Sequence, residues 1–446
     1  MAVFKELDED ILFVIFRTCD VYTVLTAARI NKLIRALALS KAVWVALVAD
    51  LIARCIMDAF SDPDFRNYSA AQLRGVVERL VCGPAWAEER PARVVRRQVS
   101  VDTSDIFSKI SPRWSTYVKL LPGGRFLTLE NYDGRLECWS LTRGLCVWTY
   151  SQKRRTNYTV EMFDDGNTAR FLLPGSLKAS FSIVQVDLTT GHSYELFRMP
   201  QKDEIRWWTD GDAVLSGNFV VLTLHVHGNR TLLLINWKEG RYLSFHQTLT
   251  APGMAVVPGH IVLATATLEP PHRPVLLAYT HASLASYWRP LADWAPTAPS
   301  DAFDLHRIQQ CSGIRPAFVM HPGAHEGWQV ASEGTRPVSQ GMRLALRPSP
   351  LQRGSYALSF VVYEKDGLQL VQSSAVPTVP VCKAGDVSYA RYSIVKPGSI
   401  EDVDLDRQEA GKTELEVIRG ESIHLSPSSG AVTTLTGPLV SVSYFV

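Results

Sequence analysis

Two histidines, His225 and His227, are the side chains best spaced in this sequence to hold a metal ion. They stand two positions apart in an apolar stretch that we expect to be a strand, so both would point to one face of a sheet. A zinc site needs three or four such ligands, and no third ligand is evident nearby in the sequence. We therefore interpret them as ordinary strand histidines and expect neither a metal site nor a cofactor.

Other motifs that could do chemistry have the wrong spacing. Gly411-Lys412-Thr413 has the ending of a phosphate-binding loop, but that loop needs glycine where this chain has Asp406. Neither a G-x-G-x-x-G nor a G-x-S-x-G motif occurs. A group of possible ligands in a Pro/Gly-rich stretch matches no metal-binding template: Cys311, His321, His325 and Glu326. We expect no catalytic residues, and hence a protein that is not an enzyme.

Basic and aromatic side chains occur together at residues 153–155, Lys-Arg-Arg, and 206–208, Arg-Trp-Trp. Arginine and tryptophan dominate the energetics of many protein–protein interfaces. The alternative is that the tryptophans are buried and the basic residues lie in loops beside them. The candidate residues for binding another protein are Arg154, Arg155, Arg206 and Trp207.

Composition limits the possible partners and compartments. The net charge of the 446 residues is +2, which gives no reason to expect binding to nucleic acid or to a membrane. The seven cysteines form no C-x-x-C pair, which is typical of reduced thiols in the cytoplasm or nucleus. The first apolar run spans six residues beside charged ones, so we expect neither a signal peptide nor a membrane anchor.

The distribution of glycine and proline divides the chain. Residues 1–62 contain neither, and all 28 glycines and 25 prolines fall in the other 384 residues (446 − 62). The first part is therefore expected to be helical. Asp8 is a plausible N-cap for a helix ending near Cys19, and Ser69 with Gln72 forms a capping box. We expect helices over about 8–19, 23–34, 42–59 and 70–82.

From about residue 100 the hydrophobic pattern has a period of two, which predicts strands. Residues 126–150 are typical of three strands joined by turns, and similar turns recur at Gly144, Gly191 and Gly240, spaced 47 and 49 residues apart. A repeat of this length predicts a β-propeller, here of about seven blades with WD-like repeats, and stacked β-sandwiches are the alternative. We expect strand pairs within 275–288 and 356–371, and a closing strand, 439–446, beside one near residue 115.

The predicted domains are a helical unit over 1–50, linker helices over 51–100 and a propeller-like domain over 101–446. Residues 87–98, AEERPARVVRRQ, are expected to be a charged, solvated linker. The fold class is therefore mainly β with a small all-α N-terminal part.

The helical unit carries a series of residues in a characteristic order and spacing: Leu7, Asp10, Ile11, Leu12, Ile15, Phe16, Val24, Leu25, Ile30, Ile34, Val43 and Trp44. In this series it resembles the F-box, a short helical motif found near the N-terminus of ubiquitin-ligase substrate receptors. The pattern departs from the family at Asp8, where proline is usual, at Asn31, where cysteine is usual, and at Ile34, where a large aromatic residue is usual. Residues 37–51 and 70–86 look like F-box proteins of basidiomycete fungi.

This resemblance implies a non-catalytic substrate receptor of an SCF-type cullin–RING ubiquitin ligase. The F-box would bind the adaptor protein and, through it, the cullin, and the β domain would hold a target protein for proteasomal degradation. The implied adaptor-binding residues are Leu7, Ile11, Ile15, Phe16, Leu25, Ile30 and Trp44. The alternative is a propeller scaffold whose helices only cap its own ring.

The first expected helix has more apolar surface than its own small unit can bury, which is a physical reason to expect a second contact surface. It is apolar on both flanks, with Ile11, Leu12, Ile15 and Phe16 on one and Phe13 and Val14 on the other. A unit of about 40 residues is too small to bury two apolar flanks by itself. One flank is therefore expected to contact a partner protein or the linker helices.

Overall fold

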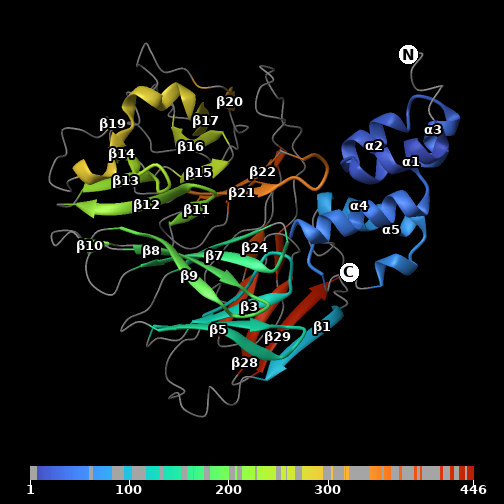
Figure 1. The fold of residues 1–446 in the computed structure, drawn as a ribbon, viewed down its shortest axis with the longest axis horizontal. Coiled ribbons are helices and arrows are strands. Elements are labelled where there is room, and N and C mark those ends of the chain that lie inside the picture. Colours follow the sequence, from blue (N-terminus) through green and yellow to red (C-terminus); the bar gives the residue numbers. More distant parts are fainter. Residues whose placement is uncertain are drawn as a thin grey trace.

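The protein is mainly β, and the α-helices among the described residues are gathered at the N-terminal end of the chain (Figure 1). The computed structural model describes residues 8–59, 64–82, 95–102, 117–130, 134–151, 158–163, 165–174, 181–199, 206–207, 213–226, 229–247, 253–257, 259–266, 274–294, 303–304, 316, 318–320, 342–353, 356–362, 371–373, 386–388, 392–393, 412–414, 422–425, 431–436 and 439–445.

The helices are α1 (Glu9–Thr18), α2 (Val21–Ala27), α3 (Lys32–Ala38), α4 (Lys41–Ala53) and α5 (Ala70–Cys82). The predictions for α1 and α5 are confirmed: Asp8 is the N-cap residue of α1. The Ser69 N–H donates to Gln72 Oε1 over 2.8 Å, and the Gln72 N–H donates to Ser69 Oγ over 3.3 Å. No single helix among the described residues is long and apolar enough to cross a membrane, although α3 and α4 together pass that test as a pair bent by 48°.

The prediction of one helix over 23–34 is wrong. The chain forms two short helices there, because polar side chains start a new helix at each N-terminus. Asp20 accepts the Thr23 N–H over 2.8 Å at the start of α2, and Asn31 accepts the Ile34 N–H over 2.8 Å at the start of α3. The third predicted helix also ends earlier than expected, at Ala53, because Cys55 takes a positive φ of 56°.

The helices share one hydrophobic core. Trp44 is among its largest fully buried side chains, and the indole Nε1–H donates to the Ala38 carbonyl over 3.1 Å. The face predicted for α5 is confirmed, since Leu73, Val76 and Val77 are buried in the same core. Other buried members of the helical core are Leu12, Phe16, Val21, Val24, Ile34, Val43, Leu47, Val48 and Leu51.

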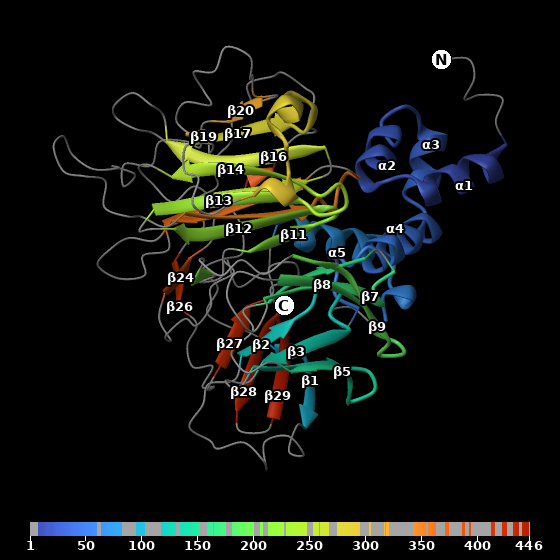
Figure 2. The ribbon, with the colours of Figure 1, turned by 60° about the vertical axis from the view of Figure 1, so that its left-hand side comes forward.

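The described β region is a series of mainly antiparallel sheets, five of them four-stranded, and the first two consist of four consecutive strands each (Figures 1 and 2). The first is β2 (Tyr117–Leu120), β3 (Phe126–Glu130), β4 (Arg135–Ser140) and β5 (Leu145–Ser151). The second is β6 (Thr159–Met162), β7 (Thr168–Pro174), β8 (Phe181–Asp187) and β9 (Ser193–Arg198). The third contains β10 (Arg206–Trp207), β11 (Val214–Ser216), β12 (Phe219–Val226), β13 (Asn229–Asn236), β14 (Arg241–Gln247), β18 (Arg289–Pro290) and β19 (Phe303–Asp304).

The remaining sheets are formed mainly by strands that come later in the chain. The fourth is β15 (Gly253–Val257), β16 (His260–Ala266), β17 (Pro274–Thr280) and β20 (Phe318–Met320). The next contains β21 (Met342–Pro348), β22 (Tyr356–Val362), β23 (Val371–Ser373) and β25 (Tyr392–Ser393), and β24 (Asp386–Ser388) pairs with β26 (Lys412–Glu414). The last described sheet joins β1 (Val95–Asp102), β27 (Ser422–Leu425), β28 (Val432–Thr436) and β29 (Leu439–Phe445).

The repeated turn glycines are confirmed. Gly144, Gly191 and Gly240 have φ values of 64°, 77° and 62°, which explains why glycine recurs there. The prediction of a strand pair over 275–288 is wrong in its second half, because a 3₁₀ helix, Ala282–Tyr287, follows β17. The first strand of the pair predicted over 356–371 is confirmed as β22; its partner β23 begins at Val371, the last residue of that range, and residues 363–370 lie outside the described residues.

The closing strand has a different partner from the expected one. β29 pairs with β1, with Val101 opposite Val440, and not with a strand near residue 115. The first strand thus begins at Val95, inside the stretch predicted to be a linker. β1 alternates Val99 and Val101 with polar residues, and the valines pack in the same core as Val440 and Val442. A closed ring of about seven blades stays a prediction.

Candidate interaction surface on the N-terminal helices

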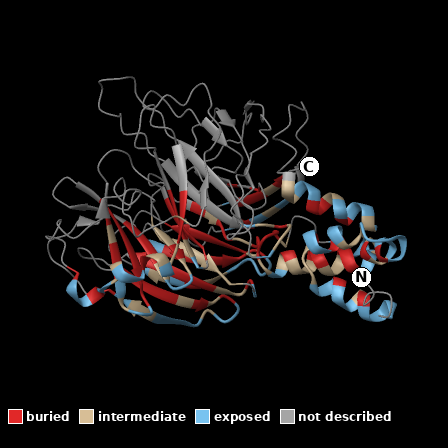
Figure 3. Ribbon diagram, turned by 90° about the horizontal axis from the view of Figure 1, so that it is seen from above, coloured by how far each residue is buried: buried red, intermediate tan, exposed pale blue. Residues whose placement is uncertain are grey.

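Exposed large apolar residues are concentrated on the first three helices. Figure 3 shows many exposed positions along the helical part of the ribbon. The described part of the chain has ten large apolar side chains that are exposed, and seven of them lie in or between α1, α2 and α3. Isolated exposed apolar residues are common, but a local concentration marks an interaction surface. These seven residues, called the apolar face below, are Ile11, Val14, Ile15, Tyr22, Leu25, Ile30 and Leu33.

Helix α1 shows how the apolar face arises. Leu12 and Phe16, four positions apart, point into the helical core. Ile11, Val14 and Ile15 are three and four positions apart on a different side, and all three are exposed. The helix is therefore apolar on two sides, and the described part of the chain covers only one of them.

The structure separates the predicted adaptor-binding residues into two groups. Ile11, Ile15, Leu25 and Ile30 are exposed and belong to the apolar face. Phe16 and Trp44 are buried in the helical core, so neither offers a surface for direct contact. Leu7 lies outside the described residues.

Three members of the apolar face were not among the predicted residues: Val14, Tyr22 and Leu33. Val14 was assigned to the opposite flank of the first helix. Tyr22 and Leu33 were missed because the candidates came from the F-box pattern, and neither residue was among its matching positions. The Asx caps at Asp20 and Asn31 were the available signal.

Charges of both signs border the apolar face. Asp8, Glu9 and Asp10 are exposed at the start of α1. Arg29, Lys32 and Arg35 are exposed before and along α3. An interface here would therefore combine an apolar centre with a polar rim, as protein–protein interfaces commonly do.

The predicted target-binding residues in the β region lie mostly outside the described side chains. Arg154 and Arg155 fall outside the described residues. Arg206 and Trp207 form β10, whose backbone pairs with β12 at His225 and Leu224, and the positions of their side chains are not described. Among the described residues, no group of three or more His, Cys, Asp or Glu side chains could hold a metal ion.

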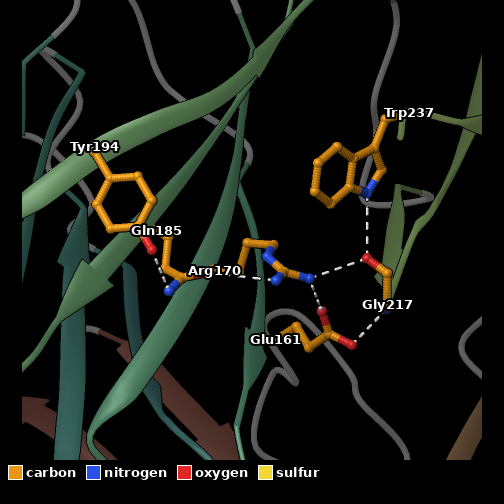
Figure 4. Close-up of polar contacts among 6 residues, drawn as sticks. All are labelled: Glu161, Arg170, Gln185, Tyr194, Gly217 and Trp237. Carbon is orange, nitrogen blue, oxygen red and sulfur yellow. Dashed lines mark hydrogen bonds and ion pairs between the residues drawn. The ribbon is translucent and has the colours of Figure 1, made fainter. Parts of the chain in front are cut away.

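A partly buried ion pair within the second sheet holds a turn of the third sheet (Figure 4). Arg170 Nη1 in β7 lies 3.4 Å from Glu161 Oε2 in β6 and donates to the Gly217 carbonyl over 3.0 Å. The Gly217 N–H donates to Glu161 Oε1 over 2.6 Å, and Trp237 Nε1–H donates to the Gly217 carbonyl over 3.1 Å. The carbonyl and the N–H of Gly217, in a turn of the third sheet, are thus each hydrogen-bonded to a charged side chain of the second sheet.

Arg170 also contacts aromatic rings and a neighbouring amide. The guanidinium carbon lies 4.6 Å from the centre of the Phe163 ring and 5.3 Å from that of Trp237. Arg170 Nη2 donates to Gln185 Oε1 over 3.4 Å, and Gln185 Nε2 donates to the exposed Tyr194 hydroxyl over 2.6 Å. The guanidinium is buried and holds Glu161, the Gly217 carbonyl and Gln185 together, so we interpret the group as structural.

Replacing Arg170 with alanine should destabilise the β region in a pH-dependent manner. Burial already raises the pKa of Glu161, against the opposing effects of the Gly217 N–H and Arg170. Without Arg170 the pKa should rise further, so that the folded state retains a proton that the unfolded state releases. The stability of the variant should therefore fall as pH rises through the pKa of folded Glu161. We expect a loss of about 2–4 kcal/mol at pH 8 and a smaller loss at pH 5.

Urea unfolding at both pH values measures this effect. The control is Arg198→Ala, which breaks an exposed ion pair with Glu195 and should change the free energy of unfolding by less than about 1 kcal/mol. If Arg170→Ala lowers the free energy of unfolding equally at both pH values, the loss does not come from an unpaired Glu161 carboxylate, and the explanation is wrong.

Comparisons with known proteins do not assign the chain to a family. No family model matches the sequence, and no curated protein matches it. Among solved structures, the chain is similar to the β-propeller domain of Cps50 (Swd1) from Myceliophteria thermophila, at 11% sequence identity. That match covers 75% of this chain and 98% of the other, with a TM-score of 0.35. A similarity of this extent supports no conclusion about function.

Proposed function

We propose that this protein is a substrate receptor of an SCF-type cullin–RING ubiquitin ligase. The observation that carries the proposal is the apolar face on α1–α3, in a segment whose sequence resembles the F-box. The adaptor protein would cover this face and connect the chain to the cullin. Ile11, Ile15, Leu25 and Ile30 would contact the adaptor directly, while Phe16 and Trp44 would hold the helices that present them.

The energy available at the apolar face is sufficient for a specific complex. Covering the exposed half of one large apolar side chain contributes about 1 kcal/mol. The seven side chains together would contribute roughly 7 kcal/mol, before the cost of association and the contribution of the charged rim.

The β region would hold the target protein. Consecutive antiparallel sheets of four strands, with the first and last strands of the region sharing one sheet, favour a β-propeller over stacked sandwiches. The chain itself would catalyse nothing. Its contribution in the cytoplasm or nucleus would be proximity, because a held target meets the conjugating enzyme at a raised effective concentration.

The second candidate is a propeller scaffold whose helices cap its own ring. A cap would bury its apolar face against the β region. The apolar residue of the β region that packs on the helical core is Leu351, among the described residues, and the seven residues of the apolar face are exposed. This arrangement favours the receptor.

Co-expression of the full chain with a ligase adaptor protein, followed by size-exclusion chromatography, tests the proposal. We expect one co-eluting complex. The matched control is Leu145→Asp, because Leu145 is an exposed apolar residue of the β region and should not affect the complex. A chain that elutes alone and monodisperse in the presence of the adaptor would overturn the proposal and favour the scaffold.

A further inference from the structure

A loop of the β region reaches back to the N-terminal helices. Residues 349–353 connect β21 and β22, and the orange hairpin in Figure 1 points with this end towards the blue helices, as it also does in Figure 2. Pro350 is buried, and Leu351 packs against the helical core. This loop is called the clamp loop below.

Backbone hydrogen bonds tie the clamp loop to the start of α2. The Tyr22 N–H donates to the Leu351 carbonyl over 2.8 Å, and the Arg353 N–H donates to Asp20 Oδ2 over 3.2 Å. Asp20 Oδ1 accepts the N–H of Thr23 in the first turn of α2. One carboxylate therefore caps the helix and holds the loop, and these hydrogen bonds together keep the pKa of Asp20 below its usual value in spite of partial burial.

The same loop also contacts α4. Arg353 Nη2 lies 2.8 Å from Asp50 Oδ1, and the other oxygen of Asp50 lies 2.8 Å from Arg54 Nε. Asp20 and Asp50 belong to different parts of the helical unit, so a single arginine residue joins α2 and α4 to the β region.

A second contact holds the helical unit at the end of α4. The Ala59 N–H donates to the Gly123 carbonyl over 2.8 Å. Gly124 has a φ of 67°, and a Cβ atom there would lie 2.6 Å from the Cβ atom of Asp58, so only glycine permits this approach. Two separate contacts, one at β2–β3 and one at the clamp loop, restrict rotation of the helical unit more than either contact alone.

We propose that the clamp loop fixes the direction in which the apolar face points relative to the β region, with Asp20, Asp50, Leu351 and Arg353 as positioning residues. The contacts themselves are independent of the function assigned to the chain. Their consequence rests on the proposed function, since a receptor with a fixed angle presents its target to the conjugating enzyme in one orientation.

Distance measurements between two spin labels test the proposal in the full chain. The labels are introduced through non-natural amino acids at Lys32 in α3 and at Glu239 after β13, because both positions are exposed and the native cysteines are avoided. The unaltered chain should give one narrow distance distribution. Arg353→Asp should give a broad one, because a third carboxylate would then face Asp20 and Asp50.

Matched variants keep this result interpretable. Leu351→Asp should broaden the distribution in the same way, whereas Arg198→Asp, at an exposed arginine of β9, should leave it narrow. The charge-swapped pair Asp50→Arg with Arg353→Asp should restore part of the narrow distribution. Hydrogen exchange at the Tyr22 amide should become faster in Arg353→Asp while the thermal unfolding temperature of the β region stays constant.

A narrow distribution in both Arg353→Asp and Leu351→Asp would overturn the proposal. The distance measurement needs no adaptor, so its outcome is separate from that of the co-expression experiment. A chain that does not bind the adaptor could still have its helices fixed by the clamp loop, and a chain that binds the adaptor could have helices that the clamp loop does not fix.

Discussion

Replacing Ile15 with aspartate should abolish binding to the ligase adaptor and leave the protein folded. Ile15 is 38% exposed and lies beside Ile11 and Val14 on the outer side of α1. An aspartate there costs the free protein little, since water still reaches the side chain. In a complex the carboxylate would be buried against apolar groups, and we expect at least about a 100-fold rise in Kd, or about 3 kcal/mol.

Binding assays with purified full-length chain and adaptor measure this effect. Ile15→Leu, which keeps an apolar side chain of similar volume, should bind nearly as well as the unaltered chain. Leu145→Asp supplies the control for adding a negative charge at an exposed apolar position elsewhere. Unchanged affinity for Ile15→Asp would remove the outer side of α1 from the interface.

Replacing Trp44 with alanine should unfold the helical unit. Trp44 is 1% exposed, packs among the helices and donates a hydrogen bond to the Ala38 carbonyl. Loss of the indole leaves a large cavity in a small core, which typically costs about 3–5 kcal/mol. Adaptor binding should be lost as a consequence of unfolding, and the β region should keep its own thermal transition.

Trp44→Phe distinguishes this structural role from direct contact. Phenylalanine fills much of the volume but cannot donate to Ala38, so a loss of about 1–2 kcal/mol is expected. Calorimetry should show a lowered helical transition, and adaptor affinity at low temperature should be retained. A Trp44→Phe variant that is fully stable yet fails to bind would mean that the indole itself contacts the adaptor.

Local signals in the sequence were sufficient for several elements. The Ser69–Gln72 capping box located the start of α5, because both hydrogen bonds are made within one turn. Gly144, Gly191 and Gly240 located turns because each needs a positive φ. The exposure of Ile11 and Ile15 did not follow from such a signal, because the apolar pattern placed both on the flank of Leu12 and Phe16, which are buried; only the F-box resemblance implied it.

Other features depend on three-dimensional contacts that a local sequence pattern does not predict. The predicted roles of Phe16 and Trp44 came from the F-box pattern, which does not separate residues that form the motif's core from those on its surface. The partner of β29 was missed because β1 begins at Val95, inside a charged stretch that was predicted to be a linker. Leu351 joins the helical core from a loop of the β region, and nothing near it in the sequence indicates that contact.

The pairing of β1 with β29 has a consequence for the order of events during synthesis. Ser100 and Ser441 are joined by a hydrogen bond although they lie 341 positions apart. The ribosome therefore releases the helices and β1 long before the partner of β1 exists, and until then β1 is an unprotected edge. A chain interrupted before Leu439 would keep that edge exposed, next to helices that are already complete. If those helices bind the adaptor at that stage, the adaptor would be bound before the β region, which would hold the target protein, has finished folding.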